Sequence, residues 1–382
     1  MGIIFVKLCK NCLFPDSKPQ LKFDENGICD ACVYSEKKIS IDWNERKQEL
    51  KNILEKYKNK TGNNYDCLIP VSGGKDSTYQ TYVIKKEFGL NPLVVNFHPR
   101  EQTELGKKNL DNLKKLGVDC VEFTTNPDVY KKLAMFGLTE LGDPMWPEHI
   151  GLFQIPVKFA VNLKIPLLVW GENPMFEYGG PVSATSPYLD KEWLENHGGY
   201  FLDKIKPQEL TKYGIGKKEL IPFIYPNEDE IRRIGITGIF LGYYTKWDAR
   251  KQLEIVKSHG FSVSDDLSEG TYTNYENLDS NIVPLHDYFK YLKYGYGRAT
   301  DQASIDIRNN RMTRDEGLKI IETYEGKIPK KCLNWFLEEY ELKFEDFLKI
   351  CDKFTNKKIF KTDRNGKIFH NKEGNLEKYP VS

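Results

Sequence analysis

Six residues near position 75 have the composition and order of an anion-binding turn: Ser72, Gly73, Gly74, Lys75, Asp76 and Ser77. They follow a strand-like apolar run over 65–71 and precede a helix-like segment that starts at residue 78. Backbone N–H groups at the start of a helix can face one anion, and glycines let the backbone approach it closely. The serines add hydroxyl donors and the lysine adds a cation, whereas the aspartate helps only if a metal ion accompanies the anion. The turn therefore predicts a phosphate site, and the alternative is an anion-free turn that caps a helix.

Four of the eight cysteines fall in two C-x2-C pairs that are separated by sixteen residues: Cys9, Cys12, Cys29 and Cys32. This spacing is typical of a four-cysteine zinc ribbon, in which each pair presents two thiolates from a tight turn. A pair of disulfides is the alternative, and it is disfavoured because the N-terminal apolar run is too short for a secretory signal. Four sulfur ligands fill the coordination sphere of zinc. We therefore expect a structural Zn²⁺ that folds a segment too small to be stable alone.

Short apolar strands alternate with amphipathic helices in the first half of the chain. Strands are expected over 65–71, 93–97, 120–123 and 165–170, and helices over 43–57, 78–88, 101–116, a segment ending near 136, and 148–163. This alternation predicts an α/β fold with a parallel, doubly wound sheet. Such sheets bind ligands beyond the carboxyl ends of their strands, so three segments should meet there: Ser72–Ser77, Asn96-Phe97-His98 and Gly171-Glu172-Asn173.

Two of these strand-end residues could take part in chemistry directly. Glu172 follows the fourth strand, where a carboxylate could bind magnesium or take a proton from an attacking amine. The alternative is an exposed loop acid. His98 follows the second strand, although a lone histidine more often has a structural role.

The βα alternation lapses between 174 and about 225, where glycine, proline and aromatic residues are frequent. A long irregular insertion in a compact domain is usually functional or disordered, and the aromatic content of this one favours a subdomain that covers the substrate. Further helices are expected at 227–234, 248–259, 301–309, 313–325 and 330–352. We therefore predict a zinc ribbon over 1–40, the α/β domain over 41–250, and a mainly helical region over 251–382 that completes the site.

Two stretches rich in glycine and aromatic residues carry further cations. The first contains Lys246 and Trp247, and the second, at the start of a predicted helix, contains Lys293, Tyr294, Tyr296 and Arg298. A glycine-aromatic turn at a helix start is again a shape that accommodates an anion. The alternative is that the aromatic rings of both stretches pack into the core.

The overall composition is that of a globular chain with balanced charge. Of its 382 residues, 40% are hydrophobic and 29% are charged, and the formal net charge is +1. That balance gives no argument for nucleic acid as a partner, so none is expected. No apolar stretch approaches the ~20 residues that span a bilayer, so we expect a cytoplasmic protein with no membrane partner.

The anion-binding turn resembles the S-G-G-x-D-S pyrophosphate loop of the ATP-pyrophosphatase superfamily and does not match the Walker pattern. With further motifs, nearly the whole chain is similar to the N-acetyl sugar amidotransferase family, which serves bacterial lipopolysaccharide and flagellin-glycan sugar pathways. These motifs are the two cysteine pairs and the runs Pro70–Ser77, Gly171–Pro174, Lys293–Asp301 and Arg311–Arg314. The loop alone specifies the superfamily, and its combination with the cysteine pairs and Lys293–Asp301 specifies the family.

The resemblance implies an ATP-dependent enzyme that converts the acetamido group of a nucleotide-activated sugar to an acetamidino group. ATP, with Mg²⁺, would adenylylate the amide oxygen, and ammonia would then displace AMP. The implied catalytic residues are Lys75, Asp76, Glu172, Lys246, Lys293 and Arg298. ATP contacts are expected from the six loop residues and from Asn96, Phe97, His98 and Gly171. Sugar-nucleotide contacts are expected from Asn173, Glu177, Tyr178, Trp247, Tyr294 and Tyr296.

The nitrogen source is expected to lie outside this chain. A glutaminase needs an N-terminal cysteine or a cysteine on a glycine-rich elbow, and none of the eight cysteines has that setting. The resemblance suggests a separate glutaminase subunit with a cyclase-like subunit that channels ammonia, similar to those of imidazole glycerol phosphate synthase. Both UDP-linked hexoses and CMP-linked nine-carbon acids remain open as substrates.

Two other classes of function remain open. A tRNA-modifying enzyme of the thiolase or lysidine type would adenylylate a base carbonyl with the same loop, and Cys120 is its candidate sulfur carrier, although it has no evident partner cysteine. A non-enzymatic nucleotide-binding protein is the second alternative, and the intact loop counts against it.

Overall fold

A five-stranded parallel sheet forms the centre of the computed structural model, which describes residues 5–59, 62–98, 100–198, 205–369 and 375–380. The spatial order is β3-β2-β1-β4-β5, and the strands are β1 (Cys67–Val71), β2 (Pro92–His98), β3 (Asp119–Thr124), β4 (Leu167–Trp170) and β5 (Thr237–Phe240). Leu68 of β1 pairs with Leu93 of β2 on one side and with Leu168 of β4 on the other. The sheet therefore has its switch point between β1 and β4, where a crevice opens at the carboxyl ends of the strands. The predicted doubly wound α/β fold is confirmed.

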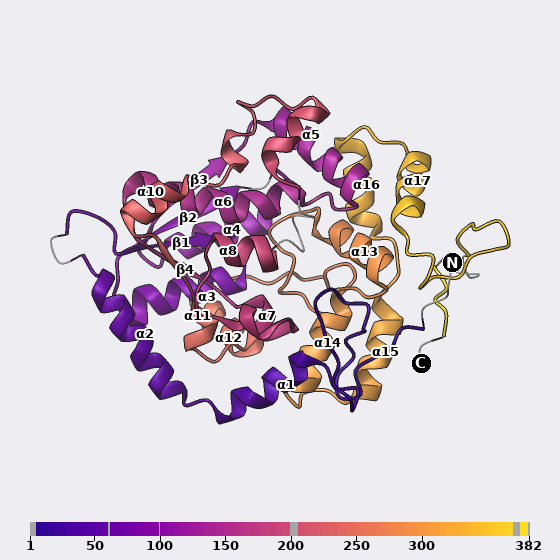
Figure 1. Cartoon of the computed structure of the whole chain (residues 1–382), viewed down its shortest axis with the longest axis horizontal. Coiled ribbons are helices and arrows are strands. Elements are labelled where there is room, and N and C mark those ends of the chain that lie inside the picture. Colours follow the sequence, from indigo (N-terminus) through magenta and orange to yellow (C-terminus); the bar gives the residue numbers. More distant parts are fainter. Residues whose placement is uncertain (1–4, 60–61, 99, 199–204, 370–374, 381–382) are drawn as a thin grey trace.

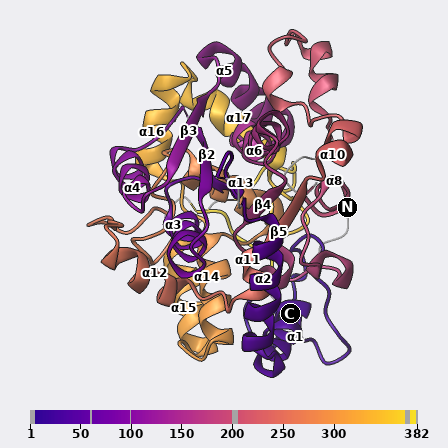
Figure 2. The ribbon, with the colours of Figure 1, turned by 90° about the vertical axis from the view of Figure 1, so that its left-hand side faces the viewer.

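Alternate side chains of the strands point to opposite faces of the sheet, and each face has its own core. Ile69 and Val94 pack on the face covered by α2 (Trp43–Tyr57), α3 (Lys75–Tyr82) and α4 (Glu104–Lys114). Leu68 and Val95 pack on the face covered by α5 (Pro127–Phe136) and α6 (Trp146–Leu163). The strands lie between α4 and α6 in Figure 2. Because both faces are covered at the centre of the sheet, β1 and β4 are continuous apolar runs, whereas the edge strand β3 is partly exposed and carries polar residues.

Most predicted ranges agree with the structure, including α10 (Glu228–Ile234) and α12 (Ala249–Ser258), and the differences have physical reasons. The sequence pattern does not reveal β5 because the strand has only four residues and one of them is Gly238. The predicted helix 330–352 is two helices, α16 (Lys330–Glu339) and α17 (Phe344–Phe354), because Glu341 between them has a left-handed backbone with a φ of 52°. Three short or irregularly patterned helices also escape prediction: α1 (Asp30–Lys37), α11 (Leu241–Tyr244) and α13 (Val283–Tyr294).

The irregular segment 174–225 consists of short helical turns, among them α7 (Pro174–Tyr178) and α8 (Lys191–Trp193), and its residues 199–204 lie outside the described part of the chain. Leu210, Leu220 and Phe223 are buried in the core on the α5–α6 face of the sheet. Among its described residues, only the end of α7 lines the pocket described below. Much of the segment that was expected to cover the substrate therefore packs against the α5–α6 face of the sheet.

The C-terminal third is helical and lies beside the N-terminal segment. Its helices α14 (Arg298–Arg308) and α15 (Arg314–Tyr324), orange in Figure 1, stand next to the indigo cysteine-containing segment and α1. The Leu13 N–H donates a hydrogen bond to the Ser304 hydroxyl at 3.3 Å, across 291 positions of sequence. None of the described helices has both the length and the apolar character that crossing a membrane requires.

Candidate active site

The predicted anion-binding turn connects β1 to α3 at the switch point of the sheet. Gly73 has a φ of 88°, which favours glycine, and a Cβ at this position would meet Leu110 of α4 at 3.0 Å. The Ser77 hydroxyl accepts hydrogen bonds from the N–H groups of Ser72 and Gly73, at 3.3 and 3.2 Å. The Ser72 hydroxyl accepts another from the Gly74 N–H at 3.1 Å. The two serines thus fix the shape of the turn, so that the start of α3 faces the crevice.

Lys75 is the first residue of α3, and its side chain is 4% exposed. Its Nζ lies 2.7 Å from Oδ1 of Asp76. Burial alone would lower the pKa of Lys75, but the carboxylates of Asp76, Glu276 and Glu172 outweigh burial and hold the pKa above its ordinary value. Lys75 therefore stays protonated and presents a buried positive charge to the crevice.

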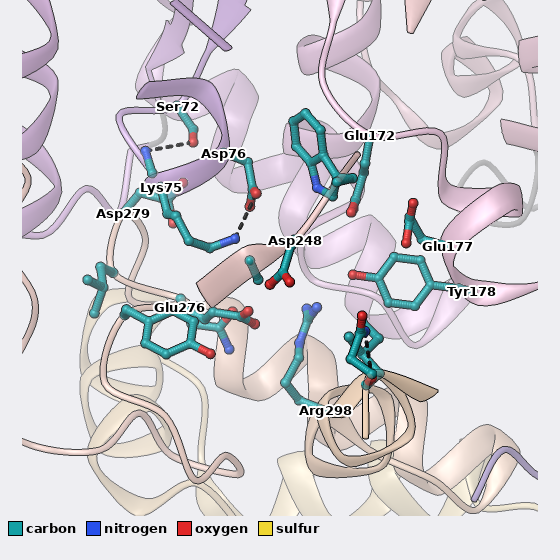
Figure 3. A pocket seen from close by; sticks show the side chains of 18 residues that line it. Ser72, Lys75, Asp76, Glu172, Glu177, Tyr178, Asp248, Glu276, Asp279 and Arg298 are labelled. Carbon is teal, nitrogen blue, oxygen red and sulfur yellow. Dashed lines mark hydrogen bonds and ion pairs between the residues drawn. The ribbon is translucent and has the colours of Figure 1, made fainter. Parts of the chain in front are cut away.

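A pocket of about 210 Å³ lies between this turn, the end of β4 and the C-terminal helices. Figure 3 shows Lys75 and Asp76 on one side, Glu172 and Tyr178 on the other, and Arg298 reaching in from below. The charged lining residues are six acids and two bases: Asp76, Glu172, Glu177, Asp248, Glu276 and Asp279, with Lys75 and Arg298. Such an excess of carboxylates would repel a polyphosphate unless a divalent cation lies between them. The donor set therefore fits the predicted combination of Mg²⁺ and phosphate.

Glu172 lies two residues beyond the end of β4 and is half-buried in the pocket. Burial, together with the negative charges of Asp76 and Glu177, raises the pKa of Glu172 to about 8. The next residue, Asn173, is buried, and its Oδ1 accepts hydrogen bonds from two N–H groups in the first turn of α7, at 3.0 and 3.3 Å. Because this cap fixes the chain immediately after Glu172, the carboxyl group is held at the mouth of β4. A carboxyl group with this pKa is largely protonated at neutral pH and becomes able to accept a proton as the pH approaches about 8.

Arg298 is the first residue of α14 and reaches the pocket from the C-terminal third. Its Nε donates to Oδ2 of Asp287 on α13 at 3.1 Å. Burial alone would raise the pKa of Asp287, but Arg298 and Lys290 lower it to about 2. Asp287 therefore stays ionised and orients the guanidinium group. The Nη groups of Arg298 make no hydrogen bond to any residue that the structure describes, so they can bind phosphate oxygens.

A segment that the sequence analysis does not predict supplies five lining residues: Tyr275, Glu276, Asn277, Leu278 and Asp279. The segment lies against the start of α4, where the Thr103 N–H donates to the Asp279 carbonyl at 3.2 Å. A Cβ on Gly106 would stand 2.6 Å from the Cα of Asp279, so glycine is required for this approach. The segment has no helical or strand periodicity. Its only sequence signal is the run of acidic and amide residues ahead of α13.

Trp247 and Asp248 line the pocket just before α12. A Cβ on Gly171 or on Gly242 would touch the Trp247 indole at 3.4 Å, so the two glycines let this ring lie against the backbone that follows β4 and β5. Asp248, which the sequence analysis does not predict, caps α12 and accepts two hydrogen bonds from Nη1 of Arg311, at 2.9 and 3.0 Å. Gly171 therefore lies behind the pocket wall and does not line the pocket itself. Asp248 lines the pocket and also holds Arg311 and the start of α12 in place.

The β2 residues that were expected to contact ATP do not line this pocket. Asn96 is buried and donates from Nδ2 to the Val71 carbonyl at 2.8 Å. Phe97 packs in the core, 6.4 Å from the ring of Phe123, and a Cβ on Gly151 would collide with it. His98 is half-buried at the end of the strand. The alternation of β2 side chains directs Asn96 and Phe97 to opposite cores, which explains why Phe97 does not line the pocket.

Four residues of the glycine- and aromatic-rich stretches also lie outside the pocket. Lys293 donates from Nζ to the Leu141 carbonyl at 3.2 Å. Tyr296 is buried, and Nζ of Lys290 stands 5.1 Å from its ring centre. Tyr294 is half-buried near the end of α13, and Lys246 is exposed and lines an adjoining cavity. Of these stretches, Trp247 and Arg298 line the pocket, whereas the rings of Tyr294 and Tyr296 do not.

The four paired cysteines are buried and converge on one point. The Sγ atoms of Cys9 and Cys32 lie 3.8 Å apart, and those of Cys12 and Cys29 lie 3.6 Å apart. A tetrahedral zinc ion with Zn–S bonds of about 2.3 Å separates its sulfur ligands by about 3.8 Å, whereas a disulfide joins them at about 2.05 Å. The arrangement therefore fits a structural Zn²⁺ and does not fit disulfides.

The N-terminal segment 5–40, here called the cysteine module, contacts both sides of the pocket. On the C-terminal side, Arg314 of α15 donates from Nε to the Cys12 carbonyl at 3.3 Å. On the α7 side, Lys38 pairs with Glu177 at 2.5 Å. The module thus joins α7 to the C-terminal helices.

Fold and site together define a class: a doubly wound α/β protein in which an S-G-G-x-D-S turn at the switch point faces an acidic pocket completed by a helical C-terminal region. Within that region, residues 269–372 match the family described as LPS biosynthesis protein WbpG-like, C-terminal domain. The matched stretch contains both Arg298 and the segment 275–279. One pocket is therefore lined both by the predicted anion-binding turn and by a C-terminal region that matches the WbpG-like family.

Two further comparisons match a curated protein and a solved structure. Over 108 residues the chain is 30% identical to the uncharacterized protein MJ1599 of Methanocaldococcus jannaschii, a stretch that is 28% of this chain and 38% of that protein. The chain thus spans less than two fifths of the curated relative that it matches. An NMN synthetase structure from Francisella tularensis aligns with 59% of this chain and 99% of that one, at 14% identity and a TM-score of 0.27. A TM-score this low does not indicate a common fold, and the α/β fold described above follows from the strand order itself.

Proposed function

We propose that this protein is an ATP-dependent amidotransferase that converts the N-acetyl group of a nucleotide-activated sugar to an acetamidino group, with AMP and pyrophosphate as the other products. The observation that carries the proposal is the single pocket in which the turn after β1 meets residues of a WbpG-like C-terminal domain. The turn supplies groups suited to splitting ATP. The family, which its description links to LPS biosynthesis, supports a sugar as the second substrate.

In the first step, the amide oxygen forms a bond to the α-phosphorus of ATP and pyrophosphate leaves. Lys75 and the start of α3 stabilise the charge that develops on pyrophosphate, and the Nη groups of Arg298 bind further phosphate oxygens. Asp76 and Glu276 are the carboxylates that would hold Mg²⁺, which supplies positive charge that neutralises the phosphates.

In the second step, ammonia adds to the imidate carbon, AMP leaves with the electrons of the C–O bond, and one proton is released. Glu172 is the proposed proton acceptor, because its carboxyl group lines the pocket and has a pKa of about 8. Water attacking the same carbon would only regenerate the amide, so the site must exclude it. Tyr178 and Trp247, both in the pocket wall, would contribute to that exclusion.

Ammonia is proposed to come from a separate glutaminase with a cyclase-like channelling subunit. Outside the cysteine module, Cys67, Cys332 and Cys351 are buried and Cys120 is half-buried. Burial raises the pKa of Cys120 to about 11 and that of Cys332 to about 12, so neither is a thiolate near neutral pH. These inert thiols support an external nitrogen source. The purified chain should turn over with ammonium chloride and not with glutamine, and turnover on glutamine alone would contradict this part of the proposal.

The direct test is mass spectrometry of UDP-hexoses and CMP-linked nine-carbon acids incubated with the chain, ATP, Mg²⁺ and ammonium chloride. One sugar nucleotide should exchange a single oxygen for an NH group, with AMP and pyrophosphate formed in equal amounts. Lys75→Met serves as the control that lacks the buried cation. Formation of ADP and phosphate, or an unchanged panel, would overturn the proposal.

The tRNA-modifying alternative has less support. Cys120, its candidate sulfur carrier, lies on β3 and does not line the pocket. AMP formation that depends on added tRNA would favour this alternative, and failure to release pyrophosphate with any acceptor would favour a non-enzymatic nucleotide-binding protein.

A further inference from the structure

A second cavity adjoins the acidic pocket and has a basic lining. Its charged residues are three cations and one acid: Lys38, Lys246 and Arg308, with Glu177. The two cavities share four lining residues, which are Glu177, Trp247, Ile305 and Asn309. We call the second cavity the α1–α14 groove, because α1 and the turn after it form one wall and α14 forms the other.

Two cations of the groove have hydrogen-bonding capacity that the described residues do not use. Arg308 donates from Nη2 to the Glu177 carbonyl at 2.9 Å, and its guanidinium carbon lies 4.9 Å from the ring centre of Phe14. Its Nη1 is buried without a hydrogen-bond partner in the described part of the chain. Lys246 is exposed, and none of the described acids forms an ion pair with it. Lys246 therefore presents a positive charge to the groove without a carboxylate partner among the described residues, and Arg308 adds a second positive charge to the same wall.

The third cation stands at the junction of the two cavities. Lys38 pairs with Glu177 at 2.5 Å, and the two side chains are only 16% and 12% exposed. Its Nζ also lies 4.6 Å from the ring centre of Phe176. Because Glu177 lines both cavities, an anion in the groove would compete with this carboxylate for Lys38.

The size of the acidic pocket indicates that a second substrate must extend beyond it. Its volume of about 210 Å³ is below the ~300 Å³ at the lower end of pockets that hold one small ligand. ATP and a sugar nucleotide therefore cannot both lie within it. The groove is the adjoining space, and its lining has the charge that phosphate groups require.

We propose that the α1–α14 groove binds the phosphate groups of the nucleotide-linked sugar, with Arg308 and Lys246 as their contacts. Trp247, in the wall common to both cavities, then lies between the sugar and the nucleotide. This assignment rests on the proposed function. It gives Lys246 a role in binding rather than in catalysis, and it divides the sugar nucleotide between the two cavities: its amide lies in the acidic pocket with ATP and ammonia, and its phosphates lie in the basic groove.

Isothermal titration of the full-length chain with UDP, with CMP and with a non-hydrolysable ATP analogue tests the groove without requiring turnover. The variants are Lys246→Glu and the control Lys251→Glu, which replaces an exposed lysine of α12 that lines neither cavity. Because both lysines are exposed, both variants should fold. We expect Lys246→Glu to weaken binding of either UDP or CMP about tenfold or more, and to leave binding of the ATP analogue unchanged. Lys251→Glu should change neither.

The possible outcomes test the groove assignment independently of the proposed reaction. Equal effects of the two variants, or no binding of UDP or CMP by the unmodified chain, would overturn the groove assignment even if the chain forms an acetamidino sugar. Binding of UDP or CMP that depends on Lys246, without amidine formation on any sugar, would support an anion site here and refute the reaction. The nucleotide that binds also selects between UDP-linked and CMP-linked substrates.

Discussion

Replacing Glu172 by glutamine should lower activity and raise stability, and the gain in stability should depend on pH. Removal of a general base costs about 10²- to 10⁴-fold in rate. The same side chain destabilises the fold when it is ionised, because burial and the neighbouring carboxylates raise its pKa from 4.5 to about 8. A carboxyl group with a raised pKa binds more protons in the folded state. The wild-type protein therefore loses stability as pH rises from about 4.5 to about 8, and the loss then levels off.

The pKa shift sets an upper limit on this effect. At about 1.4 kcal/mol per pKa unit, a change from 4.5 to about 8 corresponds to about 5 kcal/mol. Glu172 is half-buried, so water screens part of the penalty, and we expect about 2 kcal/mol at alkaline pH. For a chain of this length that difference amounts to a rise of about 2–4 °C in Tm. As the pH falls toward 4.5, the Glu172 side chain becomes neutral in both the folded and the unfolded state, so the Tm values of the wild type and of Glu172→Gln should converge.

Thermal unfolding between about pH 5 and pH 9 measures the stability difference, with the exposed Glu254→Gln as control. The wild-type kcat/KM should rise with pH through about 8 when the concentration of free ammonia is kept constant, and the Glu172→Gln profile should lack that rise. A Tm difference that does not change with pH would refute the environment assigned to Glu172. Full activity of Glu172→Gln would refute its role as proton acceptor.

Four further predictions address the other parts of the site. Lys75→Met should lower pyrophosphate release more than 100-fold, about the cost of one preorganised charge, and an assay of pyrophosphate tests it while circular dichroism verifies folding. Asp287→Asn should raise the KM for ATP, because it leaves Arg298 without its orienting carboxylate; an unchanged KM would show that Arg298 needs no such partner. Gly179→Ala should loosen the cysteine module, because Gly179 has a φ of 86° and a Cβ there would stand 2.3 Å from Oδ1 of Asp30; limited proteolysis should release the module earlier than in Gly214→Ala, where a Cβ meets nothing. Chelation of zinc should abolish UDP or CMP binding before the sheet unfolds, and a single coincident transition would contradict this order.

The central fold could be predicted because the central strands β1 and β4 are continuous apolar runs and the helices between the strands have an amphipathic period. The strand β5 could not, since four residues with a glycine carry too little pattern, although it completes the sheet beside β4. The split between α16 and α17 depends on the backbone of Glu341, a residue type that gives no warning of a left-handed conformation. Local signals thus account for the layers, and the exceptions depend on tertiary packing.

The candidate site, like the fold, could be predicted from the sequence only in part. The turn at Lys75 and the position of Glu172 follow from motif and topology, because both lie at the carboxyl ends of neighbouring strands. The contributions of Glu276 and Asp279 do not, since their segment has no periodicity and reaches the pocket only because Gly106 permits a close contact with α4. Phe97 shows the opposite error: the strand end is in the right place, but the pleat turns its side chain into the core.

The cysteine module has a consequence for how ATP splitting and substrate conversion depend on zinc. The turn after β1 and the sheet behind it make no use of the four cysteines, whereas the groove takes one wall from α1 and the turn after it. On the proposed function, a chain without zinc would keep the turn that activates an oxygen and would lose the groove wall that binds the sugar nucleotide. It would then split ATP with water in place of the amide. The ratio of pyrophosphate to amidine formed would in that case report the zinc content of the preparation.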